Sequence, residues 1–239
     1  MAEPLQPRHP RSSDEELLEA ETSAILAELT DAQRLLRIQD ELRNGFQALG
    51  RIGKAVTIFG SARTPVDHPR YAQARALARR LGQEGFAIIT GGGPGVMEAA
   101  NRGARDAGVP SVGLGIELAH EQGMNGYVDL PLNFHYFFTR KVMFVRYASA
   151  FVVFPGGFGT MDELFEAATL RQTEKIRYFP IVLVDSRYWG GLVDWLRDPM
   201  LAEGNVSPAD VSTLAVCDDL DRVVEIVEDV EHRRPRRAA

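Results

Sequence analysis

From Lys54 to His232, short apolar runs alternate with longer stretches whose apolar residues recur at helical spacing. The short runs have the length of buried strands, and the longer stretches have the period of amphipathic helices. We therefore predict strands at 55–59, 86–90, 111–115, 150–154, 179–184 and 214–217, with a further short strand near 127–130. Helices are predicted at 71–83, 96–107, 137–148, 160–172, 189–201 and 220–230.

This alternation is typical of βαβ units, in which helices cover both faces of a parallel sheet. The predicted fold class is α/β: a Rossmann-like, doubly wound, mainly parallel sheet with helices on both faces. Ligands of such folds bind at the carboxyl ends of the strands. We expect this catalytic, nucleotide-binding domain to span residues 54–232.

The N-terminal region has a different pattern. Residues 1–12 hold three prolines without apolar periodicity, which predicts disorder. Residues 13–53 are predicted to be a helical extension, one amphipathic helix running to about Leu49 on the body or on a second subunit. A capping-box pattern marks its start, Ser12 or Ser13 followed by Glu15 or Glu16. Residues 233–239 form a short basic tail, which we expect to be solvated.

Composition restricts the possible classes of function. The 239 residues are 45% hydrophobic and 25% charged, with a net charge of −6. These values are ordinary for a globular domain, and the acidic charge argues against nucleic acid as a partner. One cysteine, Cys217, predicts a buried strand thiol in a reducing compartment. Neither a signal peptide nor a membrane-spanning stretch is apparent, so no membrane association and a cytoplasmic location are expected.

Three glycine-containing segments follow three of the predicted strands: residues 60–63, 91–95 and 155–160. Glycine in each segment is also explained by turn geometry alone, but the shared position of the three segments at one edge of the sheet favours a nucleotide-sized site. Residues 155–160 also open a helix, whose free N–H groups and positive dipole end suit a phosphate. Ser61 is placed to donate a hydrogen bond to phosphate or ribose.

Other cofactor sites are not indicated. A dinucleotide fingerprint GxGxxG starting at Gly91 or Gly93 requires a third glycine where Val96 or Glu98 stands. The chain has no GxxxxGK[ST] run, its five histidines have no metal-ligand spacing, and neither Lys141 nor Lys175 lies in a pyridoxal-binding context. We predict no metal and no cofactor.

The sequence PGGFGTMDE at 155–163, with Thr139-Arg140-Lys141-Val142-Met143 upstream, resembles the PGGxGTxxE signature and Arg-Lys pair of the LONELY GUY family. The similarity extends through residues 60–63 and 91–98 and covers about 54–230. The resemblance implies phosphoribohydrolase activity on cytokinin nucleotides, with Arg140 and Glu163 as catalytic residues. It extends the expected substrate-binding set to Ser61, Gly91, Gly92, Gly93, Gly95, Met97, Glu98, Lys141, Gly156, Gly157, Gly159 and Thr160.

We therefore predict an enzyme that hydrolyses the N-glycosidic bond of a nucleoside 5′-monophosphate, AMP or an N6-modified AMP, to free base and ribose 5-phosphate. Two alternatives stay open: a broader purine or pyrimidine nucleotide nucleosidase, and a non-catalytic nucleotide- or molybdenum-cofactor-binding protein. Simpler interpretations exist for both catalytic candidates. Arg140 is equally consistent with a surface ion pair, and Thr160-x-x-Glu163 with a capping box.

A homodimer or higher homo-oligomer is also expected. The predicted helices 137–148 and 160–172 carry apolar residues around much of their circumference, which requires cover on more than one side. The family resemblance implies dimers as well.

Overall fold

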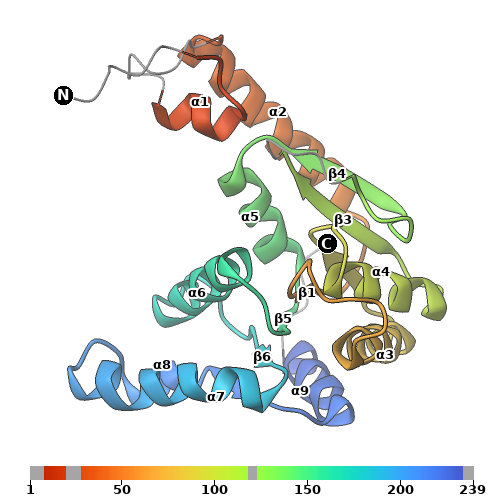
Figure 1. Ribbon diagram of the computed structural model, residues 1–239, viewed down its shortest axis with the longest axis vertical. Helices are drawn as coiled ribbons and strands as arrows, with labels where there is room; N and C mark the ends of the chain where they lie inside the picture. The colour runs from red at the N-terminus through yellow and green to blue at the C-terminus, as the bar shows by residue number, and fades with distance from the viewer. Residues whose placement is uncertain (1–7, 20–27, 118–122, 234–239) are drawn as a thin grey trace.

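The computed structural model describes residues 8–19, 28–117 and 123–233. Its centre is a seven-stranded sheet in the order β4-β3-β2-β1-β5-β6-β7, with every neighbouring pair parallel (Figure 1). The strands are β1 (Ala55–Phe59), β2 (Ala87–Thr90), β3 (Ser111–Ile116), β4 (Leu130–Phe134), β5 (Ala150–Val153), β6 (Ile181–Leu183) and β7 (Leu214–Val216).

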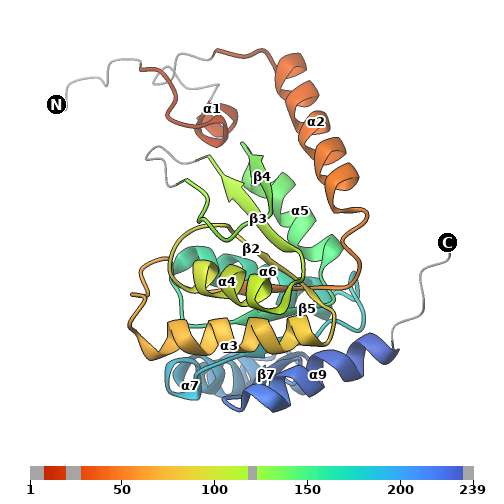
Figure 2. The ribbon, with the colours of Figure 1, turned by 90° about the vertical axis from the view of Figure 1, so that its right-hand side faces the viewer.

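Helices cover both faces of this sheet. In chain order they are α1 (Ser13–Glu19), α2 (Asp31–Leu49), α3 (Pro69–Gln83), α4 (Val96–Ala107), α5 (Phe137–Tyr147), α6 (Phe158–Gln172), α7 (Ser186–Trp195), the π-helical turn η1 (Leu196–Met200), α8 (Pro208–Val211) and α9 (Leu220–Arg233). One core joins the sheet to α5, α6 and α7, and the other joins it to α3, α4 and α9 (Figure 2). The predicted doubly wound α/β class is confirmed.

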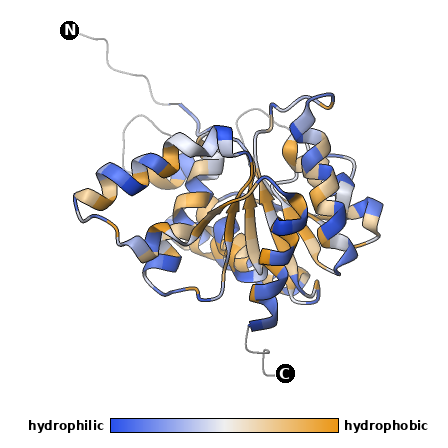
Figure 3. Cartoon of the chain, turned by 90° about the horizontal axis from the view of Figure 1, so that it is seen from below, coloured by the Kyte–Doolittle hydropathy of each residue, from blue (hydrophilic) through white to orange (hydrophobic). Residues whose placement is uncertain are grey.

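The central strands are continuous apolar runs in the sequence because both of their faces are buried. Every residue of β1, β2 and β5 is buried, because helices lie on both faces. Figure 3 shows the apolar strands at the centre, surrounded by helices whose polar residues face outward. The edge strand β4 alternates instead, with Pro131 and Asn133 exposed.

Several predicted boundaries were wrong. The extra strand expected near 127–130 is β4, which begins only at Leu130. The helix expected over 189–201 begins earlier, at Ser186, and changes to the π-helical turn at Leu196, close to Pro199. The predicted buried thiol was also wrong: Cys217 lies one residue beyond the edge strand β7, is half-buried, and contacts the carbonyl oxygen of Asp219 at 3.4 Å.

The single helix predicted from residue 13 to about Leu49 is two helices, α1 and α2. Thr30 caps a new helix, because its hydroxyl accepts from the N–H of Gln33 while the Gln33 side chain accepts from the N–H of Thr30. Residues 20–27, which the single predicted helix included, lie outside the described residues. At the start of α1, the Ser12 hydroxyl accepts from the N–H of Glu15, as expected of a cap.

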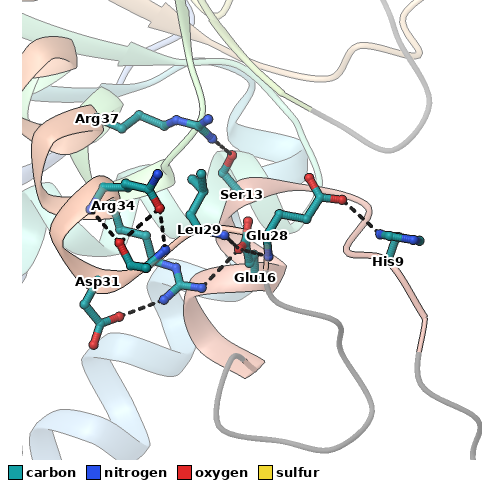
Figure 4. A network of polar contacts seen from close by, with 10 residues as sticks. His9, Ser13, Glu16, Glu28, Leu29, Asp31, Arg34 and Arg37 are labelled. Atoms are coloured by element: carbon teal, nitrogen blue, oxygen red, sulfur yellow. Dashed lines mark hydrogen bonds and ion pairs between the residues drawn. The ribbon is translucent and has the colours of Figure 1, made fainter.

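A buried carboxylate joins α1 to α2 (Figure 4). One oxygen of Glu16 accepts from the N–H groups of Glu28 and Leu29 at 2.7 and 2.6 Å and from Arg34 at 3.0 Å. Arg34 also binds Asp31 at 2.7 Å. Because Glu16 and Arg34 are both buried, these bonds hold the N-terminal region as one unit.

The N-terminal unit also contacts the carboxyl edge of the sheet. The N–H and hydroxyl groups of Ser13 donate to Glu117, directly after β3. Asp14 accepts from the N–H of Phe137, the first residue of α5. This places α1 beside the helix that carries Arg140.

Candidate functional site

A cleft of about 640 Å³ opens at the carboxyl edge of the sheet, where β1 lies between β2 and β5. From β1 the chain winds toward β4 and then returns to form β5 on the other side. Ligands of open α/β sheets bind at such a switch point. The lining residues are Phe59, Gly60, Ser61, Ala62, Arg63, Gly91, Met97, Arg140, Phe144, Gly157, Phe158, Gly159, Thr160 and Glu163.

Backbone hydrogen bonds of Ser61 join the loops around the cleft. Its N–H donates to the carbonyl oxygen of Pro155 at 2.9 Å, and its carbonyl oxygen accepts from the N–H of Val96 at 3.1 Å. The Ser61 hydroxyl accepts from the N–H of Arg63 and keeps its proton available for a ligand. The predicted meeting of the three glycine segments at one edge is thus observed.

Two of the glycines are required by close packing. A Cβ at Gly95, where φ is +69°, would lie 2.4 Å from the carbonyl oxygen of Ser61. A Cβ at Gly156 would lie 2.1 Å from Oγ1 of Thr160. These glycines bring the loops together, whereas a Cβ at Gly157 or Gly159 would meet open space.

The start of α6 faces the cleft without a side-chain cap. Gly157 is the N-cap, and Phe158 and Gly159 begin the helix. The first N–H groups of a helix have no partner within it, and they lie at the positive end of its dipole. Together with the open space beside Gly157 and Gly159, this end of α6 can accommodate a phosphate.

Arg140 and Glu163 face each other at one side of the cleft. Nη2 of Arg140 lies 3.8 Å from Oε1 of Glu163, and both side chains are largely buried. The Arg140 guanidinium also lies over the rings of Phe137 and Phe144, at 5.0 and 5.4 Å from their centroids. Neither oxygen of Glu163 has a hydrogen-bond partner among the described residues, and the same is true of Nε of Arg140.

This environment changes the protonation of both groups. Burial raises the pKa of Glu163 from its usual 4.5 to about 7, although the nearby charges of Arg140 and Lys141 act in the opposite direction. Burial lowers the pKa of Arg140, partly offset by Glu163. A carboxyl group that titrates near neutrality is suited to proton transfer.

The capping-box interpretation of Glu163 was wrong. The helix α6 begins at Phe158, so Glu163 lies in its second turn and Thr160 in its first. The N–H of Thr160 donates to the carbonyl oxygen of Gly157 instead. The alternative interpretation of Arg140 as a surface ion pair was wrong as well, because only 12% of its side chain is exposed.

Six of the predicted site residues do not line the cleft: Gly92, Gly93, Gly95, Glu98, Lys141 and Gly156. Lys141 binds Asp162 at 2.8 Å and Glu166 at 3.0 Å, and so links α5 to α6. Glu98 accepts from the hydroxyl of Tyr71 on α3. Both side chains therefore have structural partners in this state of the chain.

The backbone carbonyl groups of Gly92 and Gly93 are hydrogen-bonded to a residue later in the chain. Their carbonyl oxygens both accept from the side-chain amide of Asn125 at 3.0 Å. Met97 covers the same loop, since its sulfur would lie 2.9 Å from a Cβ placed at Gly91. Of these residues, Gly91 and Met97 reach the cleft.

Six lining residues were not predicted: Phe59, Gly60, Ala62, Arg63, Phe144 and Phe158. Gly60, Ala62 and Arg63 stand beside Ser61 in a segment that the sequence had singled out, so their position was a usable signal. Phe158 stands between two predicted glycines and is 95% exposed. Phe59 and Phe144 are buried core residues of ordinary apolar pattern, which sequence alone does not distinguish.

Among residues 8–19, 28–117 and 123–233, no group of three or more His, Cys, Asp or Glu side chains is arranged to hold a metal ion. In the same part of the chain, no helix is both long and apolar enough to cross a membrane.

Comparison with known proteins gives the family. The model of the family described as "Possible lysine decarboxylase" matches residues 97–227, more than half of the chain. The chain belongs to this family, the LONELY GUY family. A protein of Rhodococcoides fascians named cytokinin riboside 5′-monophosphate phosphoribohydrolase is 27% identical over 73% of this chain and 89% of its own length. One of the same name from Mycobacterium tuberculosis is 34% identical over 64% of this chain and 84% of its own.

Solved structures of low identity share the fold. The molybdenum cofactor carrier protein of Chlamydomonas reinhardtii aligns with a TM-score of 0.55 at 20% identity, covering 75% of this chain and 98% of its own. The molybdenum cofactor binding protein of Rippkaea orientalis aligns with a TM-score of 0.53 at 19% identity, covering 74% of this chain and 96% of its own. At these identities the likeness extends to the fold alone.

Proposed function

We propose that this LONELY GUY protein hydrolyses the N-glycosidic bond of a nucleoside 5′-monophosphate, AMP or an N6-modified AMP, and releases free base and ribose 5-phosphate. The observation that carries the proposal is the buried Arg140–Glu163 pair beside the uncapped start of α6, within one cleft. The names of the relatives from R. fascians and M. tuberculosis support the same activity.

In this proposal the start of α6 binds the 5′-phosphate. The N–H groups of Phe158 and Gly159 donate to the phosphate oxygens. Thr160 packs against Gly156 and keeps the loop in place. A phosphate held at the start of α6 fixes the rest of the nucleotide, so that its glycosidic bond is positioned beside Glu163. The binding energy of the phosphate is then used to orient the reacting bond.

Glu163 then acts on the reacting centre. Cleavage of the bond between C1′ and the base nitrogen develops positive charge on the ribose, which the carboxylate stabilises. Glu163 takes a proton from water as the water oxygen bonds to C1′, and the electrons of the broken C1′–N bond leave with the base. The base takes up a proton from solvent and Glu163 releases its proton to solvent, so that one water molecule is consumed and the carboxylate is restored. Arg140, held over Phe137 and Phe144, balances the charge of the carboxylate and presents donors to the substrate.

The test compares AMP and adenosine as substrates of the purified chain, in the absence and presence of a chelator, with products separated by chromatography. We expect ribose 5-phosphate and adenine from AMP with or without chelator, and far slower cleavage of adenosine, which lacks the anchor. Equal rates for the two substrates would contradict the phosphate anchor. A panel of other nucleoside monophosphates distinguishes a broader nucleosidase.

The substitution Glu163→Gln tests the role of the carboxylate. Removing a group that takes part in proton transfer lowers turnover by about a hundredfold or more, while AMP binding survives because the start of α6 is unchanged. If the wild-type chain cleaves none of the nucleotides but retains a pterin through purification, the non-catalytic alternative is correct instead.

A further inference from the structure

A second set of polar side chains lies between α3 and α4, away from the cleft. Two adjoining cavities of about 530 and 360 Å³ share Arg75, Arg102 and Asp106. We call them the arginine groove; Arg79 lines one cavity, and Arg105 and Tyr127 line the other. The arginine groove and the catalytic cleft have no lining residue in common.

The close approach of α3 and α4 explains why long side chains gather there. A Cβ at Gly103 of α4 would lie 2.3 Å from the carbonyl oxygen of Arg75 and 2.7 Å from Cβ of Ala78. Because the two backbones nearly touch at this crossing, side chains longer than alanine have to extend along its flanks. The arginines of both helices therefore face the same space.

Four arginines and one aspartate line this groove, and one of the arginines, Arg105, is paired with Asp129 at 3.4 Å. Arg75 binds Asp106 through two hydrogen bonds of 2.5 and 2.9 Å. The hydrogen bond from Arg75, with the fields of Arg75, Arg102 and Arg79, holds the pKa of Asp106 below its usual value. One carboxylate thus lies within reach of three guanidinium groups, in a chain whose net charge is −6.

Two of these guanidinium groups have no carboxylate bound to them in the described part of the chain. Arg102 stacks on the ring of Tyr127 at 5.3 Å and lies beside the hydroxyl of Tyr71, which donates to Glu98. These contacts hold its guanidinium in place, which reduces the entropy lost when it binds an anion. Arg79 is exposed and forms no ion pair with any of the described residues.

We propose that the arginine groove binds the phosphate group of a small phosphorylated molecule, at a site separate from the cleft. A phosphate dianion would neutralise the charge of Arg79 and Arg102, and guanidinium groups bind phosphate oxygens in pairs. The cavities have the size of small-ligand sites. Inorganic phosphate and a phosphate ester share the required chemistry, and the experiment distinguishes these two sources.

The experiment is a titration of the isotopically labelled full chain, carrying Glu163→Gln so that AMP is not cleaved during the measurement, with inorganic phosphate and, separately, with AMP, followed through backbone amide resonances. Gly126 and Tyr127 report on the groove, whereas Gly157 and Gly159 report on the cleft. We expect saturable shifts at Gly126 and Tyr127. Tighter binding of inorganic phosphate would assign the site to the free ion, and tighter binding of AMP to a phosphorylated metabolite.

Arg79→Glu is the test variant, and Arg80→Glu is its matched control. Arg80 is the next residue of α3 but pairs with Asp221 of α9, outside the groove. Arg79→Glu should weaken binding at Gly126 and Tyr127 by at least about tenfold, the effect of losing one charge-assisted contact. Arg80→Glu should leave this binding nearly unchanged.

The proposal is overturned if Gly126 and Tyr127 show no saturable shift, or if the two variants weaken binding equally, which would indicate only the general field of the surface. Because Gly157 and Gly159 are followed in the same spectra, failure of the groove is distinguished from failure of the cleft.

Discussion

The buried carboxyl group of Glu163 should make the stability of this protein fall as pH rises. Its pKa is about 7 in the folded chain and 4.5 in the usual, solvated state. Between these values the unfolded chain has released the proton and the folded chain still holds it, so that stability decreases with increasing pH. At 1.36 kcal/mol for each pKa unit, the decrease amounts to about 3 kcal/mol.

Glu163→Gln removes this titration and keeps the shape of the side chain. Below pH 4.5 the wild-type carboxyl group is neutral, and the two proteins should have similar stability. Above pH 7 the wild type holds an unsolvated carboxylate, so the variant should be more stable by about 3 kcal/mol. The attraction to Arg140 is already contained in this difference, because it contributes to the pKa itself.

The assay is urea unfolding of both proteins at about pH 5 and pH 8.5, followed by circular dichroism. The quantity to compare is the change in the stability difference between the two pH values, in which all other titrating groups cancel. Glu174→Gln, at a glutamate just beyond α6 that is 75% exposed, controls for the substitution itself. Parallel pH profiles for wild type and Glu163→Gln would refute the burial of an unpartnered carboxyl group.

Three further predictions follow from the same site. If Glu163 acts as a base, kcat/KM for AMP should rise with pH and level off above about 7, because kcat/KM reports the protonation of the free enzyme; a flat profile of kcat/KM against pH would contradict this role. Gly156→Ala should lower the melting temperature, because the added Cβ would overlap Thr160. Gly159→Ala should keep the fold and raise KM for AMP, because its Cβ enters open space in the cleft. Equal effects of the two substitutions on stability would contradict the assignment of these glycines. Light scattering should give the mass of a dimer or larger oligomer. Phe165→Asp, on the exposed side of α6, should shift the measured mass toward that of the monomer. An unchanged mass would exclude Phe165 and its side of α6 from the interface.

The central strands and most helices could be predicted because their periodicity is simple. The buried strands β1, β2 and β5 are continuous apolar runs, and α4 has the predicted bounds. The edge strand β4 was misplaced because it contains Pro131 and exposes alternate residues, which weakens the strand signal. The break before α2 depended on the Thr30–Gln33 capping box, a local signal that a helical stripe of leucines concealed.

Apart from Arg140 and Glu163, which the family resemblance indicated, the site was predictable only as far as the chain order determines it. Because three glycine segments follow β1, β2 and β5, parallel topology brings them to one edge. Chain order does not determine the directions of the Arg140 and Lys141 side chains. They are consecutive on α5, so their side chains leave the helix about 100° apart, and the packing of α5 on α6 directs one to Glu163 and the other to Asp162. No pattern in the sequence contains that information.

The unusual state of Glu163 is clearest beside the other buried glutamates of the described chain, Glu16 and Glu41. Glu16 accepts two N–H groups and Arg34. Glu41 contacts the N–H and Nδ1 of His135 at 2.8 and 2.7 Å and accepts from the hydroxyl of Thr139 at 2.6 Å. These two carboxylates replace the hydrogen bonds they lose to water, so the cost of burying them is offset.

Glu163 has no such partners, and Arg140, at 3.8 Å, supplies charge without a hydrogen bond. A glutamine or a leucine at this position would avoid the loss of about 3 kcal/mol above neutral pH. A residue that lowers the stability of the free protein has a role that stability does not explain. Glu163 lines the cleft, and neither of its oxygens has a hydrogen-bond partner among the described residues. In the proposed reaction, water and a ribose ring that is gaining positive charge would supply these hydrogen bonds and this charge, and this complementarity supports the proposed catalytic role of Glu163.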